Sequence, residues 1–237
     1  MMLAFLFWLV PIAFAQPACD APARRFLDHA FFQICYDSSL KSAVWTAYEL
    51  RPEHLSAPAT RRTSFRRDPS LSAPAASNAD FRGAGYSRGH LIPAADFAWS
   101  EQAFHATFYL TNVVAQNQSV NSGRWRNLED MVRRIAASAD TVHVFTGPLF
   151  DSDVIEFLAP GGVAVPTHTY KVLLAVHGNR RTMFAAIVPN AANPRQPLNY
   201  FAVTVDEVER RAGLDFFSFL EDAEEAALES SLGLFPQ

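Results

Sequence analysis

The segment from Tyr86 to Glu129 constrains this chain of 237 residues more than any other part of its sequence. It contains Ser87-Arg88-Gly89-His90 and places a histidine, an arginine, several side-chain amides and a carboxylate in one short stretch. Its C-terminal part predicts a helix from about residue 121 to residue 137, because apolar residues recur there at helical spacing. These residues are Trp125, Leu128, Val132 and Ile135. The fold must therefore carry a set of reactive polar groups beside one amphipathic helix.

The composition is that of a folded globular protein. Hydrophobic residues make up 49% of the chain and charged residues 19%, which argues against a disordered protein. The length suffices for one domain with a substantial core or for two small ones. No internal repeat, heptad array or abrupt change of composition divides the sequence. We therefore expect a single α+β domain over residues 16–237.

Hydrophobic patterning predicts strands on both sides of the central segment. Two apolar runs flank a polar turn between residues 31 and 50, which is typical of a β-hairpin. Further strands are expected at residues 141–145, 170–176 and 182–188, which are rich in Val, Leu, Phe and Ala. Residues 51–85 are rich in Pro, Ser, Ala and Arg. We expect them to form a long loop, and a loop of that length in a compact domain usually has a function.

Capping patterns predict three more helices. Ser100 is a candidate N-cap for a short helix that follows it. Thr204 with Glu207, and Ser218 with Glu221, have the spacing of capping boxes. Each of these pairs is expected to open a helix near the C-terminus.

Residues 1–15 predict a signal peptide. They carry no charge and end in Ala13-Phe14-Ala15, the small-x-small pattern that signal peptidase cleaves. A membrane anchor is the alternative, but the apolar run is short for a membrane span and contains Pro11. No Lys or Arg precedes the run, which departs from the usual signal pattern. We expect a secreted or periplasmic protein with no stable membrane association after cleavage.

The two cysteines, Cys19 and Cys35, lie just after the expected cleavage site. In an exported protein such a pair predicts a disulfide that fixes the mature N-terminus, and closing a loop of this size contributes about 3 kcal/mol. Two unrelated buried thiols are the alternative. A zinc site built from several cysteines is excluded, because the chain has no others.

Charge is distributed unevenly along the chain, although the net charge is only −4. Residues 51–134 carry eleven arginines and no lysine against seven acids, a balance of +4. Residues 205–237 carry two arginines against nine acids, a balance of −7. A phosphate responds to the local field rather than to net charge. The arginine-rich part is therefore a candidate polyanion site, with a solvated surface as the plain alternative.

The central segment has the groups that hydrolysis of a phosphodiester requires. His90 is a candidate base for deprotonating water, because imidazole titrates near neutral pH. Arg88 is a candidate phosphate ligand through its guanidinium fork. Asn121 offers an amide oxygen to a hard cation such as Mg²⁺, and Glu129 is a candidate acid near the waters of that ion.

Each of these residues also has a structural interpretation. His90 by itself is more typical of a loop or core histidine, and Asn121 of a helix N-cap. Glu129 is suited to an ion pair with Arg133 one turn later on the helix. The combined spacing, rather than any one residue, favours a catalytic site.

As one pattern, the segment resembles the sugar-non-specific DNA/RNA endonucleases of the ββα-metal type. That family, which includes secreted bacterial nucleases and mitochondrial endonuclease G, has an Asp-Arg-Gly-His signature. A Ser/Thr-Asn segment with a Gln follows it, and then an Asn, a Trp and a Leu-Glu pair. This chain has the corresponding residues in register over roughly residues 47–135. They are Ser87-Arg88-Gly89-His90, Thr111-Asn112, Gln116, Asn121, Trp125 and Leu128-Glu129.

The resemblance implies a role for each matching residue. His90 matches the general base, Asn121 the direct protein ligand of the metal, and Glu129 the acid near the metal-bound waters. Arg88 and Arg133 match arginines that contact phosphate. Two matching amides, Asn112 and Gln116, are implied to support the site.

Two positions leave the family comparison open. The family has a further arginine upstream of the signature, for which Arg62 is the candidate here, with Arg61 adjacent. Ser87 stands where the family usually has Asp, which removes a charge but retains hydrogen-bonding capacity. We expect this change to affect rate and metal affinity rather than reaction type.

The resemblance implies a ββα-metal fold with a central antiparallel sheet flanked by helices. It further implies cleavage of DNA and RNA to 5′-phosphate ends with one Mg²⁺ or Mn²⁺, and a possible homodimer. No base-reading module is recognisable, so little sequence preference is expected. The alternatives are a catalytically weak relative that binds nucleic acid or a partner, and an exported phosphodiesterase for small substrates.

Overall fold

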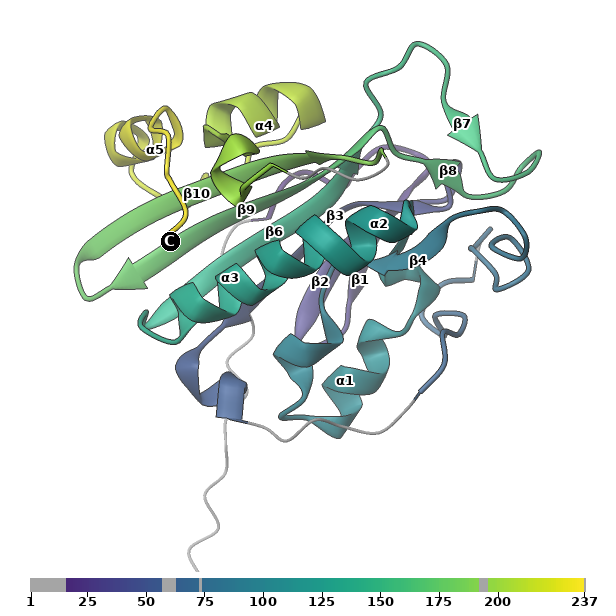
Figure 1. The fold of residues 1–237 in the computed structure, drawn as a ribbon, viewed down its shortest axis with the longest axis horizontal. Helices are drawn as coiled ribbons and strands as arrows, with labels where there is room; N and C mark the ends of the chain where they lie inside the picture. Colours follow the sequence, from purple (N-terminus) through teal and green to yellow (C-terminus); the bar gives the residue numbers. More distant parts are fainter. Residues whose placement is uncertain (1–15, 57–62, 73, 192–195, 237) are drawn as a thin grey trace, which may run out of the picture.

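The computed structural model describes residues 16–56, 63–72, 74–191 and 196–236. Its centre is a seven-stranded, fully antiparallel sheet with the order β1-β2-β3-β6-β9-β10-β11 (Figure 1). These strands are β1 (Arg24–Asp28), β2 (Phe32–Asp37), β3 (Ser42–Leu50), β6 (Thr141–Leu149), β9 (His168–His177), β10 (Arg180–Pro189) and β11 (Ala202–Val203). Two separate hairpins pair β4 (Ser87–His90) with β5 (Val113–Gln116) and β7 (Glu156–Phe157) with β8 (Ala164–Val165).

Helices cover both faces of this sheet. One face carries α2 and α3, and the other carries α4 and α5 (Figure 1). The α-helices are α1 (Glu101–Thr107), α2 (Gln118–Val120), α3 (Arg126–Ala136), α4 (Val205–Ala212) and α5 (Asp222–Glu229). A π-helical turn, Asn121–Trp125, joins α2 to α3. Short 3₁₀ helices occur at Pro52–Ser56, Ala94–Phe97, Leu110–Asn112 and Leu198–Tyr200.

Alternation along the strands builds one apolar core on each face. On β6, Val144 packs in the cluster that contains Leu128 and Val132 of α3. The next residue, Phe145, packs in the cluster that contains Val208 of α4. Side chains of a strand point alternately to opposite faces, so both faces of the sheet are buried, and the sheet separates the α3 side of the molecule from the α4 side.

Most predicted elements are confirmed. The hairpin corresponds to β2–β3, the three later strands to β6, β9 and β10, and the short helix after Ser100 to α1. Ser100 Oγ accepts a hydrogen bond from the backbone nitrogen of Ala103 at 3.3 Å, and Thr204 caps α4 in the same way. The central helix starts earlier than predicted, because Asn117 caps it and α2 begins at Gln118.

The capping box predicted at Ser218 is wrong. α5 begins at Asp222, and its N-cap is Glu221, whose side chain accepts a hydrogen bond from the backbone nitrogen of Glu224 at 3.2 Å. A carboxylate can replace a hydroxyl as the N-cap, because it accepts hydrogen bonds from the free N–H groups of the first turn. The positive end of the helix dipole also stabilises its negative charge.

The predicted disulfide between Cys19 and Cys35 is confirmed. It attaches the N-terminal segment to β2, and the indole of Trp45 adds a hydrogen bond to the carbonyl of Ala18 at 3.5 Å. The signal peptide predicted at residues 1–15 lies outside the described residues. Among the residues that the structure describes, no helix is long and apolar enough to cross a membrane.

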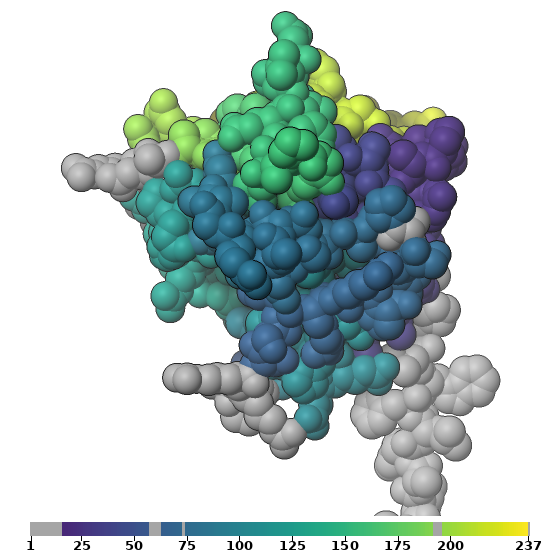
Figure 2. All heavy atoms as spheres, turned by 90° about the vertical axis from the view of Figure 1, so that its right-hand side faces the viewer, coloured from purple at the N-terminus to yellow at the C-terminus, as the bar shows by residue number. Residues whose placement is uncertain are grey.

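Residues 63–72 and 74–86 form an extended surface segment, in agreement with the loop predicted at residues 51–85, although Pro52–Ser56 form a short 3₁₀ helix. One β-bridge among these described residues, between Arg66 and Tyr109, pairs the segment with the rest of the chain. Asp68 fixes the segment, because its buried carboxylate accepts from Thr111 Oγ1 at 2.6 Å and lies 3.1 Å from His29 Nε2. Figure 2 shows the segment as a broad blue band of surface next to the green β7–β8 region.

Candidate active site

The β4–β5 hairpin and the helix after it bring the central segment together as a ββα unit. β4 and β5 pair antiparallel, with His90 opposite Val113 and Ser87 opposite Gln116. Gly89 permits this close packing, since a Cβ there would lie 2.3 Å from Gln116 Oε1. The indole of Trp125 then donates to the carbonyl of His90 at 3.0 Å and connects the helix to the hairpin.

His90 lies in an aromatic pocket with a free ring nitrogen. Its ring centroid is 4.9 Å from that of Phe65 and 4.9 Å from that of Phe108. Nε2 is buried and has no hydrogen-bond partner among the described residues. Burial lowers the pKa of His90 to about 4, so the imidazole is neutral at physiological pH. A neutral imidazole with an unused nitrogen is equipped to accept a proton.

Arg88 and Ser87 flank His90 on β4. The guanidinium of Arg88 lies 5.2 Å from the ring centroid of Phe81 and donates to the carbonyl of Asn78 at 3.1 Å. Its Nε is buried and has no hydrogen-bond partner in the described part of the chain, so this side chain retains donor capacity for an anion. Ser87 donates to the side-chain oxygen of Gln118 and thereby ties β4 to α2.

The two supporting amides have different environments. Asn112 is fully used, because it accepts from the backbone nitrogen of Ile92 at 2.9 Å and donates to the carbonyls of Ile92 and Thr107. It therefore fixes the loop that follows His90. Gln116 is buried as well, but neither of its side-chain polar atoms has a partner in the described structure. A buried amide without partners is costly, which favours a bound water or ligand at Gln116.

Asn121 is not the helix N-cap that its position suggested. Asn117 takes that place, accepting from the backbone nitrogen of Ser119 at 3.0 Å, and Asn121 begins the π-helical turn one residue after α2. Its backbone nitrogen donates to the carbonyl of Asn117, while its side chain forms no hydrogen bond with any described residue. π-helical turns often occur at functional sites. The amide oxygen of Asn121 is thus available to a cation.

The ion pair expected between Glu129 and Arg133 does not form. Arg133 instead donates to Asp96 at 2.7 Å and to Asp130 at 2.5 Å. Asp96 is fully buried and also accepts from the hydroxyl of Tyr48 at 2.6 Å. The buried carboxylate thus competes successfully for Arg133, and Glu129 has no hydrogen bond to any residue that the structure describes. Two of the nitrogens of Arg133 are already occupied, so its capacity to contact a phosphate is reduced.

Lys171 is a site residue that the sequence did not reveal. It lies on β9, fully buried, and donates to Thr146 Oγ1 at 2.7 Å and to the carbonyl of Leu91 at 3.3 Å. Its ammonium is 5.0 Å from the ring centroid of Trp125. Burial lowers the pKa of Lys171 to about 8, against an opposing effect of Glu129. The only available signal was one lysine inside an apolar strand.

Glu129 and Lys171 affect each other electrostatically. Burial raises the pKa of Glu129 to about 7, and the charge of Lys171 opposes that shift. No direct ion pair joins them, because the described ion pairs within 4.0 Å do not include either residue. The charge of Lys171 favours the ionised form of Glu129, and the side chain of Glu129 has no hydrogen bond to any described residue.

A hard divalent cation fits the donors that the structure leaves unused. Asn121 offers a neutral oxygen and Glu129 an anionic one, and Mg²⁺ and Mn²⁺ prefer oxygen ligands. Both donors come from the stretch of α2, the π-helical turn and α3, which is kinked at Gly123. Arg61 and Arg62, the candidates for an additional phosphate contact, lie outside the described residues.

Comparison with known proteins places this site in a family. Residues 11–223 match the DNA/RNA non-specific endonuclease family. Human mitochondrial endonuclease G is 39% identical over 198 residues, covering 78% of this chain and 67% of its own length. Nuclease EXOG of Danio rerio is 36% identical over 223 residues, and this chain spans 64% of its length. Nuclease C1 of Cunninghamella echinulata var. echinulata is 36% identical, with 84% of this chain and 85% of the relative covered.

A solved structure supports the same assignment. A crystal structure of the EndoG/EndoGI complex, which concerns the inhibition of EndoG, matches with a TM-score of 0.78 and 30% sequence identity. The match covers 83% of this chain and 86% of the other. The fold expected from the sequence, an α+β ββα-metal nuclease with a large antiparallel sheet, is thereby confirmed. This chain belongs to the DNA/RNA non-specific endonuclease family, a family of phosphodiester hydrolases.

Proposed function

We propose that this chain is an exported endonuclease that hydrolyses phosphodiester bonds of DNA and RNA with one divalent metal ion and His90 as the general base. The observation that carries the proposal is the buried, unpartnered Nε2 of His90 within the ββα unit. A neutral imidazole in that position takes a proton from water, which then attacks phosphorus in line with the leaving 3′ oxygen. The products are a 5′-phosphate and a 3′-hydroxyl.

The chain's own residues keep His90 in place. Trp125 and Asn112 fix the backbone at the end of β4 and just after it, through the carbonyl of His90 and the peptide groups of Ile92. Lys171 donates a hydrogen bond to the carbonyl of Leu91, the residue after His90. With the backbone so fixed, the ring keeps one orientation between Phe65 and Phe108, which favours a productive geometry at little entropic cost.

Asn121 is the proposed direct ligand of Mg²⁺ or Mn²⁺, and Glu129 is proposed to accept hydrogen bonds from the waters of that ion. When bound, the cation supplies positive charge for the departing 3′ oxygen. Arg88 is proposed to bind the phosphate oxygens, with Arg62 as a second contact. Because Asp96 and Asp130 hold Arg133, we assign it mainly to orienting the helix and only secondarily to the phosphate.

The proposed contacts of this site go to phosphates rather than to bases, and phosphates are common to DNA and RNA. The arginine-rich residues 51–134 favour a polyanion. Phosphate contacts position a nucleic acid without reading its sequence. We therefore propose weak sequence preference and cleavage that slows as salt rises, since released counterions drive binding.

Export rests on the N-terminal region. The apolar residues 1–15 and the disulfide between Cys19 and Cys35 are typical of a protein that folds in an oxidising compartment. Two of the relatives are named as mitochondrial, so the compartment is a point to test directly. Mass spectrometry of the mature protein is expected to find Gln16 at the N-terminus. The predicted homodimer stays a prediction, which light scattering of the purified chain would test.

The decisive assay is nicking of supercoiled plasmid with and without EDTA. Wild-type protein is expected to nick DNA only with the divalent metal present. His90→Ala is expected to lower the rate by about 10²- to 10⁴-fold, the usual contribution of general acid–base catalysis. Ser87 favours one alternative, a catalytically weak protein that binds nucleic acid. That alternative predicts equal and negligible nicking by the two proteins together with retained DNA binding, and such a result would exclude the proposal.

A further inference from the structure

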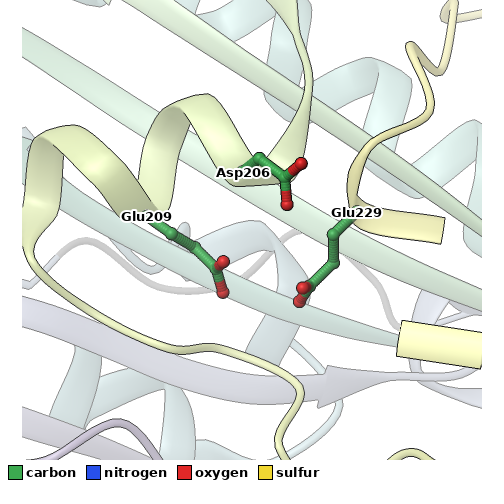
Figure 3. Close-up of side chains that lie close together, drawn as sticks. All are labelled: Asp206, Glu209 and Glu229. Atoms are coloured by element: carbon green, nitrogen blue, oxygen red, sulfur yellow. The ribbon is translucent and has the colours of Figure 1, made fainter. Parts of the chain in front are cut away.

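A second group of acidic side chains lies on the other face of the sheet, between α4 and α5 (Figure 3). Asp206 and Glu209 come from consecutive turns of α4, and Glu229 is the last residue of α5. One carboxylate oxygen of each residue lies within 4.8 Å of the other two. Since α4 packs in the apolar core opposite to α3, the sheet separates this group from His90.

Glu229 is buried without the partners that a buried carboxylate needs. Its exposed fraction is 6%, and its Oε1 is fully buried with no hydrogen-bond partner among the described residues. Figure 3 shows its side chain directed toward that of Glu209. Buried charges in proteins are paired or bind metals, because the desolvation cost is otherwise large. The unpartnered oxygen therefore points to a missing cationic ligand.

In the described structure, no cationic side chain pairs with the three carboxylates. Among the described residues, no ion pair within 4.0 Å reaches Asp206, Glu209 or Glu229. The nearby arginines are engaged elsewhere: Arg210 pairs with Glu207, Arg211 with Asp151 and Arg181 with Glu224.

Further acids add to the negative field at Glu229. Burial, and then the charges of Glu209, Glu225, Asp206 and Asp215, raise the pKa of Glu229 to about 8. The same region accounts for the balance of −7 over residues 205–237. A cation from solution is the simplest way to compensate this field.

We propose that Asp206, Glu209 and Glu229 form a structural Ca²⁺ site that joins α5 to α4. Three carboxylates supply only hard oxygen donors, which select Ca²⁺ or Mg²⁺ over softer metals. Ca²⁺ binds oxygen at 2.3–2.6 Å, so opposite ligands lie about 5 Å apart, and carboxylates within 4.8 Å of one another fit this span. The same bound also admits Mg²⁺, but Mg²⁺ demands near-ideal octahedral geometry, whereas Ca²⁺ accepts the irregular geometry of three side chains from two helices.

The site gives α5 a second attachment, in addition to the surface ion pair of Glu224 with Arg181. Glu229 is the one buried residue of the described helix, and Leu228 is only partly buried against the core. A helix of eight residues with so little apolar contact is marginal by itself. Ca²⁺ bound across both helices stabilises the folded protein in proportion to its occupancy.

Thermal unfolding of the EDTA-treated chain, with Ca²⁺ as the added probe, tests the proposal. We expect millimolar Ca²⁺ to raise the Tm of the wild type by roughly 4 °C or more. Glu229→Gln and Glu209→Gln should each reduce this shift to about 1 °C or less. Glu224→Gln is the matched control: it lies on the same helix but is paired with Arg181, and its shift should equal that of the wild type.

Two further measurements separate this site from the catalytic one. Asn121→Ala should retain the full Ca²⁺ shift, and Glu229→Gln should retain metal-dependent plasmid nicking. Isothermal titration calorimetry should show Ca²⁺ binding by the wild type that is lost in both Glu209→Gln and Glu229→Gln. The use of two variants keeps the test valid if one of them folds poorly. An absent shift, a shift unchanged in Glu229→Gln, or a shift lost only in Asn121→Ala would each overturn the proposal. Because nicking and Ca²⁺ stabilisation are measured separately, either conclusion can fail without the other.

Discussion

Buried or partly buried carboxylates lie on both faces of the central sheet, but among the described residues those on the α3 face have cationic side chains close to them, whereas Glu229 on the α4 face has no ion pair. Asp96 accepts from Arg133 at 2.7 Å, and Glu129 lies in the field of Lys171. On the opposite face, Glu229 lies beside Glu209, and its buried Oε1 has no hydrogen-bond partner among the described residues. The catalytic face thus has a fixed network that holds its geometry before any ligand binds, whereas the α4–α5 face depends on an ion from solution.

The sharpest way to break this network is Lys171→Met. The substitution removes the hydrogen bonds to Thr146 and Leu91 and leaves Glu129 without its counter-charge. We expect a loss of about 3 kcal/mol in the free energy of unfolding, measured in urea, because the change leaves the buried acceptors at Thr146 and Leu91 without their donor and removes a nearby positive charge from Glu129. Lys41→Met is the control, since Lys41 forms only a partly exposed pair with Asp80 at 3.9 Å and should cost less than about 1 kcal/mol.

A double-mutant cycle then tests whether Lys171 acts through Glu129. Combined with Glu129→Gln, Lys171→Met should show a coupling of about 1 kcal/mol or more. Losses that add to within about 0.5 kcal/mol would mean that the two residues are independent.

The same chemical change is expected to have opposite signs on the two faces. Asp96→Asn removes the charge that binds Arg133 and should cost about 2 kcal/mol. Glu229→Gln, in metal-free protein at pH 8, should instead stabilise by about 1 kcal/mol, or roughly 2–4 °C in Tm. The folded pKa of Glu229, about 8, lies above its unfolded value, so the stability of the wild type falls as pH rises toward 8. Scanning calorimetry at pH 5 and pH 8 checks this, because the gain should nearly vanish at pH 5.

The smallest expected effect is a displaced pH profile. Neutral His90 is the proposed base, and burial lowers its pKa to about 4. Burial raises the pKa of Glu129 to about 7, so the wild-type profile combines both groups. In Glu129→Gln the acid limb of kcat/KM, which reports the free enzyme, should therefore lie below pH 6 rather than near 6.5. An acid limb at 6.5 that persists in Glu129→Gln would contradict the burial of His90 as the controlling factor.

The sequence predicted what local pattern and family register determine. Alternating apolar residues predicted β6, β9 and β10, and the motif at Ser87 to His90 predicted the ββα unit. The partners of polar groups were harder, because tertiary packing determines them. Arg133 pairs with Asp96, which is 37 residues away, rather than with Glu129 on its own helix. Local spacing has no information about such a buried competitor.

The other features that the sequence did not predict also depend on tertiary packing. In the sequence, Lys171 is an ordinary residue of a strand. Only the packing of β9 against Leu91 and Trp125 gives it a role beside the site. The acidic C-terminal region showed its charge in the sequence, but only the packing of α4 against α5 brought Asp206, Glu209 and Glu229 together. The pairing of distant segments therefore marks the limit of what this sequence alone could predict.

Anomalous diffraction from crystals grown with Mn²⁺ tests the catalytic assignment most directly. The proposed function predicts an ion bound to the side-chain oxygen of Asn121, on the same side as the His90 ring and with Glu129 reaching its waters. The peak should disappear in Asn121→Ala crystals. A wild-type map with no ion at Asn121, or with the ion held by other residues of the ββα unit, would contradict the assignment.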